Sequence, residues 1–412
     1  MWFFYYIAVK AYGFAILIFS LFNKKAAQWI SGRTGLFKLV ENTLQPNEKR
    51  IWFHCPSLGE FEQGKPVLDA IRNEYPNHKI VLTFFSPSGY LVKKNEPKAD
   101  YVFYLPLDGP SNSKWFVKTV QPSMAFFVKY DFWHFYIKEL RDKKIPVFSV
   151  AAIFRPSQIY FRWYGKFFKD ILKNFTHLFV QNQESLALLY KNNLAHVSVS
   201  GDTRFDRVYE NSRNKKPFQE IEKFKNNQFL LVAGSTWNAD EKLIADLINK
   251  SEDVKFIIAP HEINQHHIET FRKALQKKSL LYSSIHKEDA SQYDVLIIDN
   301  VGMLSRLYAY ADVSYVGGGF GAGIHNSLEA IAFGAPVLFG PRYEKFQEAM
   351  ELIQQQTAFE IENSDQLIYI FNDLKNNTER RKEISTKNIR YIESRKGATD
   401  VVMNYLRINY SH

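Results

Sequence analysis

The chain has 412 residues, which is too long for one ordinary hydrophobic core, so we expect two domains. Its apolar fraction of 46% is that of a folded protein, and its net charge of +10 favours an anionic partner: a phosphorylated substrate, an anionic membrane or a nucleic acid. Nucleic acid ranks third, because no nucleic-acid-binding motif is present and the basic residues are spread along the chain. The single cysteine, Cys55, excludes an intrachain disulfide framework, and no clustered Cys/His pattern predicts a zinc site.

The N-terminal segment, residues 2–22, is apolar and rich in aromatic side chains, with Lys10 as its only interruption. Basic residues follow it at Lys24, Lys25 and Arg33. This pattern predicts a membrane anchor whose downstream chain is cytoplasmic, and the segment is just long enough to span a bilayer. Interfacial insertion and a buried amphipathic helix of the first domain are the alternatives.

Short apolar runs alternate with helical patterns along the rest of the chain, which predicts parallel, doubly wound sheets. In the first half we expect strands at 51–54, 79–85, 101–105, 124–129, 146–151, 177–181 and 197–200 and helices ending near 75 and over 132–143 and 160–173. In the second half we expect strands at 229–233, 254–259, 294–298, 313–316 and 336–339, and helices from 238 and over 264–277, 301–309, 346–355 and roughly 365–411. The polar stretch 209–227 is expected to be a linker and cap.

The glycine-rich loop after the strand at 313–316 is the strongest candidate ligand site. Glycines let a backbone approach a ligand closely, and the helix after the loop points its free N–H groups at a phosphate. Glu329, one turn into that helix, is placed to bind sugar hydroxyls. The alternative is local, because Asn326-x-x-Glu329 also has capping-box spacing. His325 is expected to face the ligand and to bind no metal, since it has no evident partner ligands.

Glu60 is the candidate general base. It follows the strand at 51–54, at a helix start, where parallel sheets place active sites. Transfer of a group to a hydroxyl needs a base near that hydroxyl. The competing interpretation is again a capping box, Ser57-x-x-Glu60.

Other candidate residues also follow strands. Gly234, Ser235 and Thr236 offer backbone N–H groups and two hydroxyls, which suit an anion. The remaining candidates are His261 and Glu262, Asp131 and Trp133, and Arg204 at the domain junction. Each has a local alternative: Asn238-x-x-Glu241 is another capping-box spacing, Asp131 is a potential helix cap, Trp133 a potential core residue and Arg204 a potential solvated cation.

Taken together and in order, these motifs resemble the lipid A Kdo (3-deoxy-D-manno-octulosonic acid) transferases. The resemblance rests on Trp52–Glu60 (W-F-H-C-P-S-L-G-E), Ser86–Gly89 (S-P-S-G), Gly201–Asp206 (G-D-T-R-F-D), Ala233–Thr236 (A-G-S-T), Val316–Gly318 with His325–Glu329, and Phe339–Pro341 with Phe346 and Glu348. It implies the GT-B fold: two Rossmann-like doubly wound domains that face a cleft, with an N-terminal membrane-associated helix. The chain departs from the family at Lys129, where the family has an acid, and its Pro260–Glu262 is a shortened motif. Arg155 only loosely echoes a family arginine.

The resemblance implies roles for the candidate residues. Glu60 is the catalytic base; donor binding falls to Arg204, Gly234, Ser235, Thr236, His261, Glu262, Gly317, Gly318, Gly319, His325, Asn326 and Glu329; acceptor binding falls to Ser57, Gly59, Ser88, Asp131 and Trp133. No cofactor or catalytic metal is implied. The implied domains are an anchor helix (1–30), an acceptor-binding domain (31–208), a CMP-sugar-binding domain (209–390) and a C-terminal helix (391–412) that crosses back to the first domain.

The expected activity is an inverting transfer of Kdo from CMP-Kdo to a lipid A precursor, at the cytoplasmic face of the bacterial inner membrane. The alternatives are another GT-B transferase or epimerase that uses a UDP-sugar, and a catalytically inactive protein that binds the membrane surface.

Overall fold

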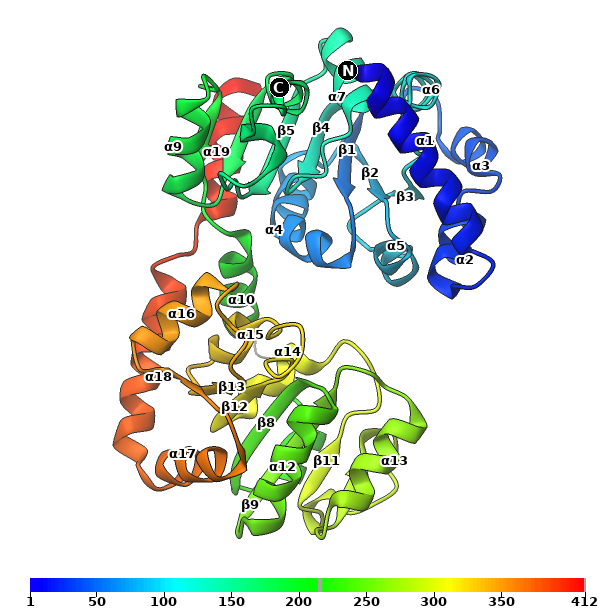
Figure 1. The fold of residues 1–412 in the computed structure, drawn as a ribbon. Helices are drawn as coiled ribbons and strands as arrows, with labels where there is room; N and C mark the ends of the chain where they lie inside the picture. The colour runs from blue at the N-terminus through cyan, green and yellow to red at the C-terminus, as the bar shows by residue number, and fades with distance from the viewer. Residues whose placement is uncertain (214–216, 411–412) are drawn as a thin grey trace. The chain divides into compact units, whose positions relative to one another are not determined.

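The computed structural model describes residues 1–213 and 217–410. It contains two compact units, Met1–Asp206 with Lys396–His412 and Arg207–Arg395. Each unit is built on one parallel seven-stranded sheet covered by helices (Figure 1). The C-terminal helix α19 (Ala398–Tyr410), red in Figure 1, packs with the first unit, where Val402, Met403 and Leu406 join a cluster of buried side chains.

The first sheet has the strand order β3-β2-β1-β4-β5-β6-β7. Its strands are β1 (Arg50–Cys55), β2 (Lys79–Phe84), β3 (Tyr101–Tyr104), β4 (Pro122–Val128), β5 (Val147–Ala152), β6 (His177–Val180) and β7 (Val197–Val199). The α-helices of this part of the chain, besides α19, are α1 (Trp2–Phe19), α2 (Lys24–Ser31), α3 (Leu36–Thr43), α4 (Leu58–Glu74), α5 (Pro87–Lys93), α6 (Pro110–Val120), α7 (His134–Asp142), α8 (Lys166–Leu172), α9 (Gln183–Lys191) and α10 (Thr203–Arg213).

The second sheet has the strand order β10-β11-β9-β8-β12-β13-β14. Its strands are β8 (Phe229–Thr236), β9 (Val254–Pro260), β10 (Ser279–Leu281), β11 (Val295–Ile297), β12 (Val313–Val316), β13 (Val337–Phe339) and β14 (Ala358–Glu360). Its α-helices are α11 (Gln219–Lys225), α12 (Asn238–Lys250), α13 (Gln265–Ala274), α14 (Leu304–Leu307), α15 (Ser327–Ile331), α16 (Gln347–Gln354), α17 (Ser364–Asn376) and α18 (Thr378–Glu393).

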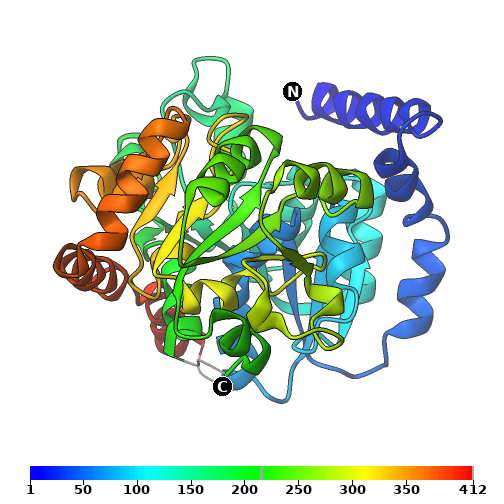
Figure 2. The same cartoon turned by 90° about the horizontal axis from the view of Figure 1, so that it is seen from below.

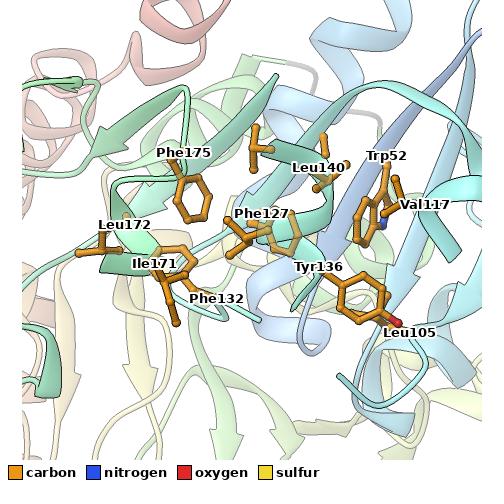
Figure 3. Close-up of a cluster of buried hydrophobic side chains, with 14 of the residues drawn as sticks. Trp52, Leu105, Val117, Phe127, Phe132, Tyr136, Leu140, Ile171, Leu172 and Phe175 are labelled. Carbon is orange, nitrogen blue, oxygen red and sulfur yellow. The ribbon is translucent and has the colours of Figure 1, made fainter. Parts of the chain in front are cut away.

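The central strands read as continuous apolar runs because helices cover both faces of each sheet. Every residue of β1 is buried, for example. On one face of the first sheet, Trp52 packs against the rings of Phe116, Phe127 and Tyr136 within a large aromatic cluster (Figure 3). Each large side chain buried in this way stabilises the fold by about 1.5–3 kcal/mol. This packing holds the strand ends that carry the candidate site.

Several predicted elements need correction. The helix expected over 160–173 is a 3₁₀ turn at Ile159–Phe161 followed by α8, and the one expected over 301–309 is α14 followed by a second 3₁₀ turn at Tyr308–Tyr310. In the stretch expected to be a linker, 209–227, α10 runs to Arg213 and α11 buries Ile221 and Phe224; residues 214–216 lie outside the described residues. The end of the helix expected to reach 411 also lies outside them.

The N-terminal helix α1 packs along one side of the first unit, and α2 and α3 follow it (Figure 2, dark blue). Tyr5 donates a hydrogen bond of 2.7 Å to the buried carboxylate of Asp108, Val9 is buried, and a side chain at Gly13 would lie 2.7 Å from Leu107. Positions 5, 9 and 13 share one helix face. The opposite face exposes large apolar side chains. Only 6% of the 18 residues Trp2–Phe19 are buried.

Candidate active site

The candidate catalytic residues of the first unit lie where the strand order of its sheet reverses. β1 and β4 are neighbours, and the chain leaves them toward opposite edges of the sheet. Such a topological switch point opens a crevice outside the carboxyl ends of the two strands, where ligands bind in α/β proteins. Glu60 follows β1 on the first turn of α4, and Lys129 directly follows β4.

The Glu60 carboxylate is held by a neighbouring side chain and remains partly exposed. Ser57 is the N-cap residue of α4, but its side chain caps no backbone N–H; its hydroxyl donates to the Glu60 carboxylate instead. The capping box that competed with the functional interpretation is therefore not formed. Gly59, beside Glu60 on α4, is exposed.

Several charged groups interact with Lys129, and Glu60 is one of them. Lys129 has a left-handed backbone (φ 64°), an uncommon conformation for a residue with a side chain. Burial and the neighbouring Arg204 lower the pKa of Lys129, while Glu60 and Asp202 oppose that shift. The Arg204 guanidinium donates to the Asp202 carboxylate at 2.7 Å. Three cations, Lys129, Arg204 and Arg155, thus interact at this strand end.

Asp131 links a buried histidine to a tryptophan. Its Oδ2 lies 3.0 Å from Nε2 of His54 and accepts a 2.9 Å hydrogen bond from Nε1 of Trp133. Asp131 and Trp133, two of the five residues predicted to bind the acceptor, thus contact each other in the loop after β4, and His54 ties them to β1. Ser88 lies on the first turn of α5, where its hydroxyl is 3.0 Å from that of the N-cap residue Ser86. The preceding Phe85 contacts the ring of Trp133, with centroids 4.9 Å apart.

The glycine-rich motifs of the second unit also meet at a switch point. β8 and β12 are neighbours, and the chain leaves them in opposite directions across the sheet. Gly234, Ser235 and Thr236 end β8, and the loop from Gly317 follows β12. A side chain at Gly317 would lie 2.3 Å from the carbonyl oxygen of Ser235, so the two motifs approach too closely for any residue but glycine.

The glycine-rich loop is anchored by Asp240, which the sequence analysis did not single out. This buried carboxylate accepts hydrogen bonds of 2.9 Å from the N–H groups of Gly318 and Trp237 and from the hydroxyl of Tyr315. Burial raises the pKa of Asp240. Gly318 takes a positive φ of 96° at this contact, while the N–H of Gly319 has no acceptor among the residues that the structure describes. Asp240 therefore fixes the loop to the start of α12.

The hydroxyl of Thr236 is already used within the protein. It donates to Glu241, which also lies 3.0 Å from Nε2 of His267. The capping box Asn238-x-x-Glu241, which was the local alternative for this motif, is absent, because the N-cap of α12 is Trp237 and its acidic partner is Asp240.

Glu329 lies on α15, which is a helix of only five residues. Asn326 caps this helix by accepting from the N–H of Leu328, and its amide donates to Glu329 at 3.2 Å. Burial raises the pKa of Glu329, and the positive charge of Arg207 opposes this shift. The cap and the ligand role proposed for Glu329 are compatible.

His261 and His325 come together although 64 residues separate them: their ring centroids are 4.5 Å apart. Glu262, next in the chain, is exposed. Among the described residues, no three His, Cys, Asp or Glu side chains are grouped so as to hold a metal ion.

Comparison with known proteins finds similarity to one family of transferases. The family profile described as 3-Deoxy-D-manno-octulosonic-acid transferase (kdotransferase) matches residues 29–207. The 3-deoxy-D-manno-octulosonic acid transferase of Rickettsia bellii is 26% identical over 380 residues, covering 88% of both chains. That of Aquifex aeolicus is 27% identical and covers 77% of this chain and 84% of its own. The chain is thus similar to Kdo transferases over most of its length. It is a glycosyltransferase.

The predicted GT-B fold is confirmed. A UDP-GlcNAc 2-epimerase from Neisseria meningitidis shares the fold with a TM-score of 0.62, 16% identity, and coverage of 87% of this chain and 100% of its own. Trp237 and Asp240 are residues of this region that the motifs in the sequence did not indicate. The predicted helix start at 238 is correct, but the N-cap is Trp237 rather than Asn238, and the spacing Trp237-x-x-Asp240 would have indicated both residues with the N-cap placed there.

Proposed function

We propose that the protein transfers Kdo from CMP-Kdo to a lipid A precursor of the lipid IVA type, with inversion, at the cytoplasmic face of the bacterial inner membrane. The observation that carries the proposal is the position of Glu60. A partly exposed carboxylate, free of a capping role, stands at the switch point of the first sheet in a chain similar to Kdo transferases.

In the proposed reaction Glu60 removes the proton from a hydroxyl of the acceptor sugar. The hydroxyl oxygen forms a bond to the anomeric carbon of Kdo while the bond from that carbon to the CMP phosphate oxygen breaks. A single displacement inverts the anomeric centre. Lys129 supplies positive charge near Glu60, and Arg155 and Arg204 add positive charge around Lys129, which suits the carboxylate of Kdo and the phosphates of the acceptor.

The second unit is proposed to bind the nucleotide. The N–H of Gly319, which has no acceptor among the described residues, and the backbone of Ser235, which has a positive φ of 55°, suit the phosphate. Glu329 suits the ribose hydroxyls. Because Thr236 donates to Glu241, we assign it a contact through its backbone rather than its hydroxyl.

The acceptor is a lipid, and the packing of α1 favours an anchor that lies in the membrane interface over one that spans the bilayer. One face of α1 is held to the first unit by Tyr5 and Val9, so the helix stays on the surface of that unit. The other face exposes Phe4, Phe14 and Phe19, each more than 60% exposed. By length and composition α1 could also span a bilayer, so the preference for the interface rests on its packing against the first unit.

The test is to incubate the purified protein with CMP-Kdo and a tetraacylated lipid A precursor, and to measure the product by mass spectrometry. We expect wild type to add Kdo and Glu60→Gln to lose activity about 10²–10⁴-fold. Glu184→Gln is the matched control, because Glu184 is an exposed first-turn glutamate of α9 in the same unit. Equal activity of Glu60→Gln and wild type would contradict the role of Glu60.

A donor screen separates the alternatives. CMP-Kdo is compared with UDP-sugars, with and without acceptor. Turnover of a UDP-sugar in place of CMP-Kdo would overturn the proposed donor, and a wild type inactive with every donor, yet bound to lipid vesicles, would support the inactive membrane-binding alternative.

A further inference from the structure

Three aromatic rings meet at the carboxyl ends of three neighbouring strands in the second unit. Trp237 follows β8, His261 follows β9, and His325 follows the glycine-rich loop after β12. The rings of Trp237 and His325 are nearly parallel, at 10°. The ring of His261 stacks on both, with centroid distances of 4.4 Å to Trp237 and 4.5 Å to His325. This stack lies beside the motifs that we propose to bind the nucleotide.

One hydrogen bond in this stack has only one possible direction. Nε1 of Trp237 lies 3.1 Å from Nε2 of His325. An indole N–H donates and never accepts, so Nε2 of His325 must offer its lone pair. A histidine with a free lone pair on Nε2 is neutral and carries its proton on Nδ1. Trp237 therefore selects one tautomer of His325.

The Nδ1–H of His325 is left available to a ligand. Nδ1 has no hydrogen-bond partner among the described residues. It is also not one of the fully buried side-chain nitrogen or oxygen atoms that lack a partner there. Burial and the neighbouring His261 also lower the pKa of His325, which favours the neutral form. Two nearby carboxylates have other hydrogen-bond partners. Asp240 on α12 accepts from the N–H groups of Gly318 and Trp237, and Glu329 on α15 accepts from the amide of Asn326.

We propose that Trp237 is a positioning residue that holds His325 in the neutral Nδ1–H tautomer, so that His325 donates a hydrogen bond to a phosphate oxygen of the sugar nucleotide. The identity of the ligand rests on the proposed function, whereas the tautomer is a property of the unliganded protein. A histidine fixed in this way needs no reorientation when the anion arrives, and it loses no proton to the leaving phosphate.

The tautomer is measured by NMR on the full chain with ¹⁵N-labelled histidine, without ligand, at about pH 8, above the usual histidine pKa. His325→Gln assigns the His325 signals. We expect wild type to show the proton on Nδ1. Trp237→Phe keeps an aromatic ring against His261 but lacks the N–H, so we expect its His325 to shift toward the Nε2–H form. A wild-type proton on Nε2, or an unchanged tautomer in Trp237→Phe, would overturn the proposal.

Titration with CMP tests the ligand contact. We expect CMP to move the Nδ1 signal of wild type, and Trp237→Phe to raise the Kd for CMP about tenfold, the effect of one hydrogen bond to a charged group. A variant that changes only the melting temperature, and neither the tautomer nor the Kd, would assign Trp237 a purely structural role and overturn the proposal. If UDP binds and CMP does not, while the His325 signals of wild type and Trp237→Phe still show the expected tautomers, the proposed donor is overturned and the role of Trp237 is supported.

Discussion

The buried carboxylate of Asp240 gives the most direct test of how the second unit holds its glycine-rich loop. Three donors converge on it: the N–H groups of Trp237 and Gly318 and the hydroxyl of Tyr315. These donors come from the start of α12, the loop and β12. Replacement of Asp240 by alanine removes the shared acceptor and leaves all three donors unpaired.

The expected cost follows from this geometry. Each hydrogen bond contributes about 1 kcal/mol net, so Asp240→Ala should lower the free energy of unfolding of the second unit by about 3 kcal/mol. Tyr315→Phe removes one of the three bonds and leaves no donor unpaired, so it should cost about 1 kcal/mol. Asp240→Asn keeps one acceptor oxygen but points an amide N–H at one of the three donors. Its cost should lie between those of Asp240→Ala and Tyr315→Phe.

The assay is denaturant unfolding followed by a probe in the second unit, together with steady-state kinetics at a temperature where every variant is folded. Because the loop is proposed to bind the donor, Asp240→Ala should raise the KM for the donor more than it lowers kcat. If Asp240→Ala and Tyr315→Phe lose the same free energy, or if both lie within about 0.5 kcal/mol of wild type, Asp240 does not anchor the loop.

Two further predictions concern the first unit. Burial raises the pKa of Asp108 to about 6, so the native state binds this proton more tightly than the unfolded chain does. The resulting stability is fully present below about pH 4 and is lost as the pH rises through 6. It amounts to at most about 3 kcal/mol. Urea unfolding from pH 4 to 7 should show wild type losing this stability relative to Asp108→Asn, and a constant difference would refute the assignment. Burial and Arg204 lower the pKa of Lys129, so substrate affinity should fall at a pH below the usual lysine range. Lys129→Arg should abolish that alkaline fall and Lys129→Met should raise KM several-fold at neutral pH; a pH profile of kcat/KM unchanged in Lys129→Arg would contradict this.

The sequence by itself determined the alternation of strands and helices, because a strand buried on both faces must be apolar and its neighbours must carry the turns. It also predicted Glu60 and the glycines of the loop as site residues, since parallel sheets place their sites after strands. The close approach of Gly317 to Ser235 explains why glycine stands there. The family resemblance of these motifs agrees with the comparisons.

Only the tertiary structure decided which partners these residues have. Capping boxes and ligand sites share the same spacing, and the spacing of Ser57 and Glu60 could not show that the hydroxyl binds the carboxylate rather than the helix N–H groups. The contact of Trp237 with His325 joins residues 88 positions apart. Side chains this distant meet only through the order of strands in the sheet, which local sequence patterns do not encode.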